Sequence, residues 1–183
     1  MQRAAPPRAW RYATPAIVLH WLLAALLVFM AGLGWWMMTV EREPEGPGLF
    51  ILHKSAGLVV LALVALRLSW RLAHRPAPLP PGVPGWEVRL GDATQLALYL
   101  LMIAVPLTGL LGAMYSRGGL AFFGAELPRW VAADRPTSKQ FFELHETLVS
   151  VLVACVALHV AGGLKHLVVD RDQVFARMWP ARR

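Results

Sequence analysis

Three long stretches of the sequence contain no Asp, Glu, Lys or Arg, and they constrain the fold more than any other feature. They cover residues 14–40, 93–116 and 147–164. A helix of about 20 apolar residues crosses the roughly 30 Å hydrocarbon core of a bilayer. A fourth stretch, residues 49–70, has an uncharged centre between Lys54 and Arg67, whose long side chains can extend toward opposite interfaces. The sequence therefore predicts four membrane-spanning helices.

The composition supports a membrane protein. Of the 183 residues, 57% are hydrophobic and 16% are charged, whereas about 25% of the residues of a soluble domain are charged. We expect an all-α membrane protein with a single domain over residues 1–183. Its four transmembrane helices are expected at about 15–39, 49–71, 92–115 and 141–169. The first apolar stretch is too long for that of a signal peptide, so we expect it to be a retained helix.

The basic residues predict the orientation. Twelve of the 18 Lys and Arg residues lie on the side that carries both termini, and six lie on the other side. Because Lys and Arg are in excess in cytoplasmic loops, both termini are expected in the cytoplasm. The net charge of +7 is spread over loops and helix ends, with no basic face of a soluble module, so nucleic acid is not expected as a partner.

Four histidines fall into two pairs. His145 and His159 are 14 residues apart in the last helix, which places them within about 40° on one face and roughly 21 Å apart along the axis. Since successive helices alternate in direction, His20 shares the cytoplasmic depth of His159, and His53 shares the external depth of His145. An unpartnered ionisable group is costly inside a bilayer. Two imidazoles from facing helices at one depth suit a haem with two axial ligands.

Small residues and one arginine support this arrangement. Gly34 is 14 residues after His20, and Gly57 is one turn after His53, so both leave gaps for a flat macrocycle. Arg67 is 14 residues after His53, on the ligand face at the depth of the cytoplasmic pair. We expect it either to bind a haem propionate or to extend to the membrane interface.

The third predicted helix contains no histidine. Its Pro106, Gly109 and Gly112 predict a local bend and close helix packing. We expect it to serve as a scaffold.

A carrier of metal ions through histidine sites is a competing interpretation. The predicted interior lacks the carboxylates that hard ions prefer, and Cys155 is the only cysteine that could bind a soft ion. Position 149, four residues after His145, is a valine, so the zinc-protease motif is absent.

The residues around the four histidines resemble the haem-ligand motifs of the bacterial cytochrome b561 family. The motifs are Leu-His20-Trp, Leu-His53-Lys-Ser-Ala-Gly, Leu-His145-Glu-Thr-Leu and Ala-Leu-His159. Met114-Tyr-Ser-Arg-Gly-Gly119 and Met178-Trp-Pro180 fit the family as well. The resemblance covers most of the chain and implies four helices and two haems b in the bacterial inner membrane. It also implies a superoxide oxidase, which passes electrons from external superoxide to ubiquinone.

Two further sites are expected, the first of them favoured by the resemblance and the second indicated by the charges of this chain. On the cytoplasmic side, His166, with Lys165 and Arg71 nearby, is expected to bind ubiquinone. On the external side, a cationic funnel for superoxide is expected, unless these residues form a solvated loop or neutralise propionates. Its residues would be Lys54, Arg117, Arg129, Arg135 and Lys139.

A second function fits the same motifs. The chain could be an electron-transfer subunit that anchors a partner dehydrogenase or hydrogenase. Such a subunit would have a docking surface for its redox partner and no activity alone.

Overall fold

Four long helices account for most of the protein in the computed structural model, which describes residues 10–44, 46–74, 76, 78–79 and 82–180. Each of the four is long and apolar enough to cross a membrane. They are α1 (Thr14–Thr39), α2 (Gly46–Ala73), α3 (Gly85–Tyr115) and α4 (Arg135–Val168). The predicted all-α membrane protein with four spanning helices is confirmed. The single-domain assignment stays a prediction, and Arg3 and Arg8 of the basic tail lie outside the described residues.

Three helices begin three or more residues before the predicted positions, because residues outside the uncharged apolar runs form their first turns. α3 begins seven residues before residue 92, with Glu87 in its first turn, where the helix dipole favours a carboxylate. α4 begins six residues before residue 141. Its N-cap, Asp134, accepts a hydrogen bond from the Thr137 backbone N–H at 3.1 Å, which satisfies a free amide of the first turn. α2 begins three residues early, at Gly46.

The helices pack around one buried cluster and present apolar side chains outward. The cluster draws on all four helices and comprises Leu23, Val60, Val64, Leu98, Tyr99, Leu101, Met102 and Leu152. Val28 and Leu72 are 73% and 74% exposed, which suits helices surrounded by lipid. Because lipid removes the hydrophobic drive for helix association, close packing must hold the helices together.

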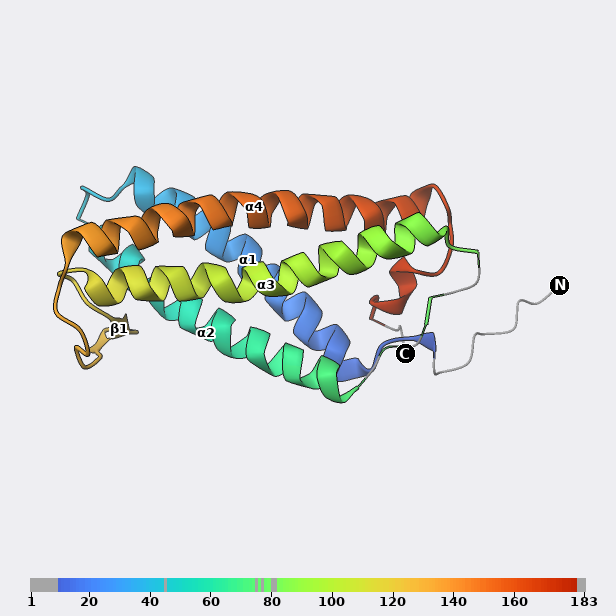
Figure 1. The fold of residues 1–183 in the computed structure, drawn as a ribbon, viewed down its shortest axis with the longest axis horizontal. Coiled ribbons are helices and arrows are strands. Elements are labelled where there is room, and N and C mark those ends of the chain that lie inside the picture. The colour runs from blue at the N-terminus through green and yellow to red at the C-terminus, as the bar shows by residue number, and fades with distance from the viewer. Residues whose placement is uncertain (1–9, 45, 75, 77, 80–81, 181–183) are drawn as a thin grey trace.

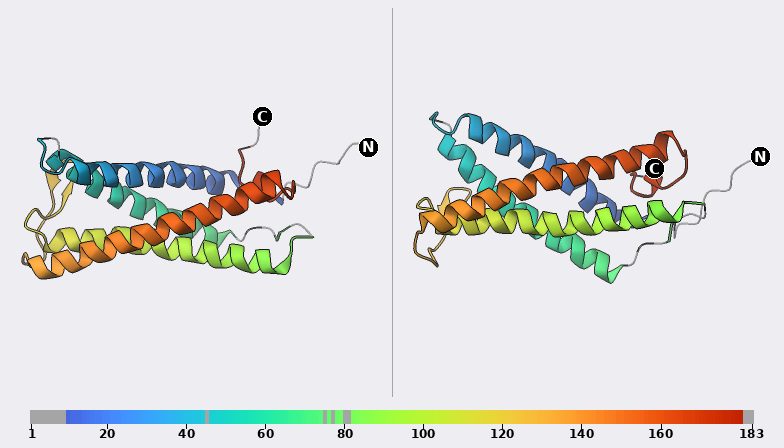
Figure 2. Two further views of the ribbon diagram at one scale, coloured as in Figure 1. Left: turned by 90° about the horizontal axis from the view of Figure 1, so that it is seen from above. Right: turned by 45° about the horizontal axis from the view of Figure 1, so that its top comes forward.

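α3 and α4 lie side by side over much of their length (Figures 1 and 2). Their closest approach uses the glycines of α3. A Cβ added to Gly112 would lie 2.7 Å from two ring carbons of Phe142, and one added to Gly109 would lie 3.0 Å from the His145 ring. The close packing predicted for these glycines is therefore observed.

The connection from α3 to α4 contains a short β-hairpin that the sequence analysis missed. Strands β1 (Ala121–Phe122) and β2 (Ala125–Glu126) pair antiparallel. The two turn residues, Phe123 and Gly124, both have left-handed backbone, with φ of 47° and 91°. This combination is required by a type I′ turn, which matches the twist of a hairpin.

Two residues that follow His53 hold the hairpin against α2. The fully buried Ser55 hydroxyl accepts from the Phe123 backbone N–H at 2.8 Å and donates to the Ile51 carbonyl at 2.7 Å. The Lys54 ammonium donates to the Gly119 carbonyl at 3.0 Å. We call this end of the molecule the hairpin end.

At the opposite end, the segment after α4 folds back over the start of α1. It contains the 3₁₀ turn η2 (Phe175–Arg177). The Tyr12 backbone N–H donates to the Arg177 carbonyl at 3.3 Å, and the Trp21 indole donates to the Met178 carbonyl at 2.8 Å. The two ends of the described chain therefore lie together, and we call this end the terminal end.

The Gly112–Phe142 contact predicts the sensitivity of the bundle to one methyl group. Gly112→Ala should lower the thermal unfolding temperature in detergent, because overpacking a close helix contact costs about 1–3 kcal/mol. Gly91→Ala, in the same helix and with no atom within 4 Å of the added Cβ, is the matched control and should not destabilise. Equal melting temperatures for the two variants would contradict this packing.

Candidate functional site

The four histidines singled out in the sequence lie in two pairs, one toward each end of the bundle. At the terminal end, the ring centres of His20 and His159 are 6.1 Å apart, with the ring planes at 68°. At the hairpin end, the ring centres of His53 and His145 are 6.2 Å apart, with the planes at 81°. We call these the terminal pair and the hairpin pair. The pairing predicted from helix direction is the one that the structure has.

The spacing of both pairs suits a metal ion bound between two imidazoles. With a metal–nitrogen bond of about 2 Å on each side and the half-width of each ring, the ring centres would be roughly 6 Å apart. Both observed separations agree with this value. Each pair lies between two different helices, as cofactor sites in helix bundles do.

The surroundings of His145 bind its Nδ1 atom and leave its Nε2 atom free. Its Nδ1 donates to the Val105 carbonyl of α3 at 2.8 Å, which fixes the ring and its tautomer, so that Nε2 can bind a metal. The absence of a side chain at Gly109 makes room for the ring. The third helix was expected to serve as a scaffold, and it holds this ring through a backbone carbonyl and a glycine. A backbone carbonyl leaves no sequence signal, whereas the glycine was visible.

His53 is held by shape more than by hydrogen bonds. Its Nδ1 is buried and has no hydrogen-bond partner among the described residues. A Cβ added to Gly34 of α1 would lie 3.3 Å from its Cε1 atom, so the gap predicted at Gly34 faces this ring. A buried polar atom without a partner is uncommon and calls for an explanation. A cofactor at the ring supplies one.

Arg67 contacts the terminal pair. Its Nη2 lies 3.2 Å from Nδ1 of His20, and its Nη1 donates to the Ala16 carbonyl at 3.2 Å. Because a guanidinium can only donate, Nδ1 of His20 accepts in this arrangement. The prediction that Arg67 lies at the depth of the terminal pair agrees with this contact.

The residues expected at the quinone site form an ion cluster at the terminal end. Lys165 bonds to Glu87 at 2.8 Å and to Asp170 at 2.6 Å. His166 Nδ1 lies 2.7 Å from Asp172, and its Nε2 lies 3.8 Å from Glu87. Ligand atoms of Glu87, His166 and Asp170 lie within 4.8 Å of one another, but the Lys165 ammonium already supplies a positive charge to both carboxylates. Glu87, Asp170 and Asp172 were not predicted from the sequence as residues of this site.

Arg71, the third residue expected at that site, contacts α3 elsewhere. Its guanidinium donates to the Gln95 side chain at 2.7 Å and lies 5.9 Å from the centre of the Tyr99 ring. Gln95 is eight residues after Glu87, which is about two turns further along α3. The structure therefore brings together Lys165 and His166 but gives Arg71 a different partner.

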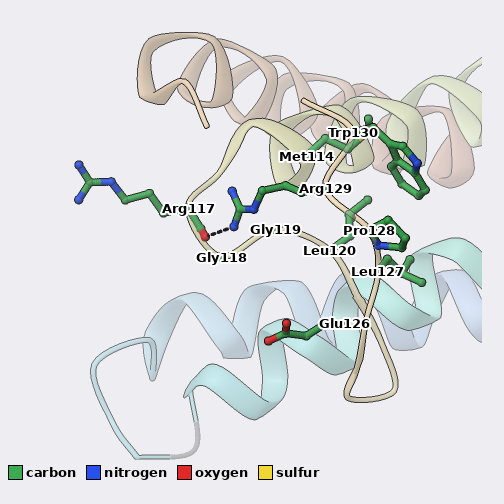
Figure 3. A pocket seen from close by; sticks show the side chains of 10 residues that line it. All are labelled: Met114, Arg117, Gly118, Gly119, Leu120, Glu126, Leu127, Pro128, Arg129 and Trp130. Carbon is green, nitrogen blue, oxygen red and sulfur yellow. Dashed lines mark hydrogen bonds between the residues drawn. The ribbon is translucent and has the colours of Figure 1, made fainter. Parts of the chain in front are cut away.

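The basic residues of the hairpin end have different surroundings. The Lys54 and Arg129 cations bind backbone carbonyls, the latter those of Ser116 and Arg117. Arg117 and Arg129 are among the residues that line a pocket of about 280 Å³ beside the hairpin, and the Arg117 side chain extends away from the other lining residues (Figure 3). Lys139 forms an exposed 3.4 Å ion pair with Glu143 one turn on, and Arg135 is the first residue of α4.

Comparison with known proteins gives the family. The family model described as prokaryotic cytochrome b561 matches residues 11–181. The chain belongs to the prokaryotic cytochrome b561 family. It is 25% identical to cytochrome b561 homolog 1 and 30% identical to cytochrome b561 homolog 2, both of Escherichia coli. The matches cover 94% and 92% of this chain and 99% and 90% of the relatives.

A third relative carries a functional name. The probable superoxide oxidase CybB of Yersinia pestis is 27% identical, over 94% of this chain and 98% of its own length.

The family defines the general role of this b561 protein. It is a multi-pass bacterial membrane protein that binds haem b and transfers electrons. The residues present fit such a group, since two pairs of facing imidazoles have the separation that a bis-histidine iron requires.

The contact between Gly109 and His145 predicts how haem binding responds to a methyl group added at position 109. Gly109→Ala should displace the imidazole and lower haem affinity by about 10–100-fold, the usual effect of disturbing the groups that orient a ligand. Haem content and the low-spin visible spectrum after purification measure the effect. A Gly109→Ala protein with the haem content and spectrum of Gly91→Ala would show that this contact does not position the ligand.

Proposed function

We propose that this b561 protein oxidises superoxide at the hairpin end and reduces ubiquinone at the terminal end. The observation that carries the proposal is the presence of one imidazole pair toward each end of a membrane-spanning bundle. The name of the Yersinia pestis relative supports it. Two superoxide anions each lose one electron, and one ubiquinone gains two electrons and two protons. The products are two molecules of O₂ and one ubiquinol.

The four histidines would hold two haems b as axial ligands, His20 with His159 and His53 with His145. When bound, haem b supplies reversible one-electron chemistry at each pair. The protein residues hold the imidazoles in place and keep water away. Hydrogen bonds to the rings, such as that from His145 to the Val105 carbonyl, fix which nitrogen is free.

The terminal end would face the cytoplasm of the bacterial inner membrane. The excess of Lys and Arg on that side supports this orientation. Superoxide would then arrive from outside, and the protons for ubiquinol would come from the cytoplasm.

His166 would deliver a proton to ubiquinone. Its ring lies between Asp172 and Glu87, with one nitrogen toward each carboxylate. An imidazole in this position can accept a proton on one side and donate one on the other. Lys165 would hold Glu87 and Asp170 in place. Arg71 would bound the same region from the side of α2 through Gln95.

The basic residues at the hairpin end would raise the encounter rate with superoxide. Charges that line a pocket focus the field on a small anion. Lys54 and Arg129 also bind backbone carbonyls of the segment that precedes the hairpin, and the side chains of Arg117 and Arg129 are exposed. Arg135 and Lys139 would add to the field from the first turns of α4.

A second function, a relay subunit for a partner dehydrogenase or hydrogenase, has one observation in its favour. The hairpin end exposes the aromatic side chains of Phe122, Phe123 and Trp130, at 41%, 62% and 64%. Such side chains are common in the centres of protein interfaces.

The assay that separates the two functions feeds enzymatically generated superoxide to the purified, haem-loaded protein with ubiquinone present. Ubiquinol formation at low salt, abolished by superoxide dismutase, is expected. A haem-loaded protein that forms no ubiquinol under these conditions would favour the relay subunit.

Electrostatic attraction of superoxide predicts a charge-reversal effect at Arg117. Arg117→Glu leaves in place the backbone carbonyl that Arg129 binds, and it should slow the superoxide-dependent rate about threefold or more at low salt. The difference should shrink at high salt, where exposed charges are screened. Arg89→Glu, exposed at the terminal end, is the control with the same charge change. Equal rates for the two variants would rule out steering by Arg117.

The proposed role of His166 predicts that its replacement slows ubiquinol formation without slowing haem reduction by superoxide. His166→Gln should slow ubiquinol formation about 100-fold, because it removes a positioned acid, while reduction of the haem by superoxide without ubiquinone stays unchanged. His74→Gln, which alters a ring stacked on Trp70, should change neither rate. Unimpaired ubiquinol formation in His166→Gln would show that His166 does not deliver a proton at the ubiquinone site.

A further inference from the structure

The two histidine pairs differ in the charge next to their rings. At the terminal pair, the Arg67 guanidinium lies 3.2 Å from Nδ1 of His20. At the hairpin pair, Nδ1 of His145 contacts a neutral carbonyl oxygen, that of Val105, at 2.8 Å. Lys54 is next to His53 in the sequence, but its ammonium binds the Gly119 carbonyl of the hairpin connection.

We propose that Arg67 raises the reduction potential of the haem at the terminal pair above that of the haem at the hairpin pair. The difference would favour electron flow from the hairpin end toward the terminal end. The inference rests on the proposed placement of one haem at each pair, and it does not depend on superoxide being the donor.

The direction in which Arg67 shifts the reduction potential follows from the change in iron charge on reduction. The ferrous state carries one positive charge less than the ferric state, so a nearby cation favours the ferrous state. A guanidinium remains charged at every pH that a protein tolerates. Arg67 is part-buried between α1 and α2, where charges are screened less than in water. Arg67 therefore acts in the direction of a higher potential.

At the hairpin pair, the hydrogen bond to a ligand ring shifts the reduction potential in the opposite direction. A carbonyl that accepts the Nδ1 hydrogen of a ligating histidine raises the basicity of the ring. A more basic ligand stabilises the ferric state. The His145–Val105 hydrogen bond therefore lowers the potential at the hairpin pair, and the two contacts together increase the difference.

A second hydrogen bond keeps Arg67 near the terminal pair when His20 binds iron. Binding through Nε2 requires the ring hydrogen to move to Nδ1, so the hydrogen bond from Arg67 to the ring is given up. Nη1 of Arg67 still has the Ala16 carbonyl, which is one turn before His20 on α1. The positive charge therefore stays within about one helical turn of the ligand.

Redox titration of the haem-loaded protein, followed by its visible spectrum, tests the inference. Arg67→Gln should shift the reduction equilibrium of the terminal-pair haem at least tenfold toward the ferric form, a lowering of 59 mV for one electron. The hairpin-pair haem should keep its potential. Repeating the titration in a His53→Ala background, which should retain only the terminal-pair haem, identifies which haem has shifted.

Two further variants separate charge from packing. Arg67→Lys keeps a cation, so the reduction potential of the terminal-pair haem should stay close to its wild-type value. Arg71→Gln, one turn along α2 and bonded to Gln95, removes an equal charge away from His20 and should give a smaller shift. Unchanged potentials in Arg67→Gln, or equal shifts of both haems, would overturn the inference alone. The absence of a haem signal in the His53→Ala background would instead contradict the proposed placement of the haems.

Discussion

The cost of placing imidazoles inside a lipid-facing bundle governs the rest of this structure. Four histidines lie in helices whose outer surfaces are apolar, and unpartnered polar groups are expensive there. The bundle brings the rings together in pairs across helices, with ring centres about 6 Å apart. Binding of a shared iron would satisfy the nitrogens that the protein leaves free. Gly34 and Gly109 leave the space that the two rings of the hairpin pair occupy.

The two ends of the bundle are built for different chemistry. The hairpin end has a pocket lined by arginines and a hairpin held on α2 by Lys54 and Ser55. The terminal end has carboxylates around His166 and Lys165, together with a folded-back segment that ties the start of α1 to the end of α4. Charges that suit an anion thus lie at one end, and groups that can move protons lie at the other.

Apolar length and histidine spacing were enough to predict the four helices and the pairing of the rings. Both depend on helix geometry alone, which fixes depth and face along one chain. The contacts of Val105, Glu87 and Asp172 could not be predicted. Val105 acts through its backbone. Glu87 meets His166 because α4 ends beside the start of α3, and Asp172 meets it because the chain turns back after α4. The hairpin was missed because its left-handed turn begins at Phe123, where sequence preferences favour Asn or Gly.

Haem stoichiometry in the wild-type protein and in the four single His→Ala variants tests the central claim most directly. The wild type should bind two haems b per chain with a bis-imidazole low-spin spectrum. His20→Ala and His159→Ala should each lose the same haem, and His53→Ala and His145→Ala should each lose the other. A colourless wild-type protein from a haem-replete host, or a single variant that retains both low-spin haems, would contradict the account.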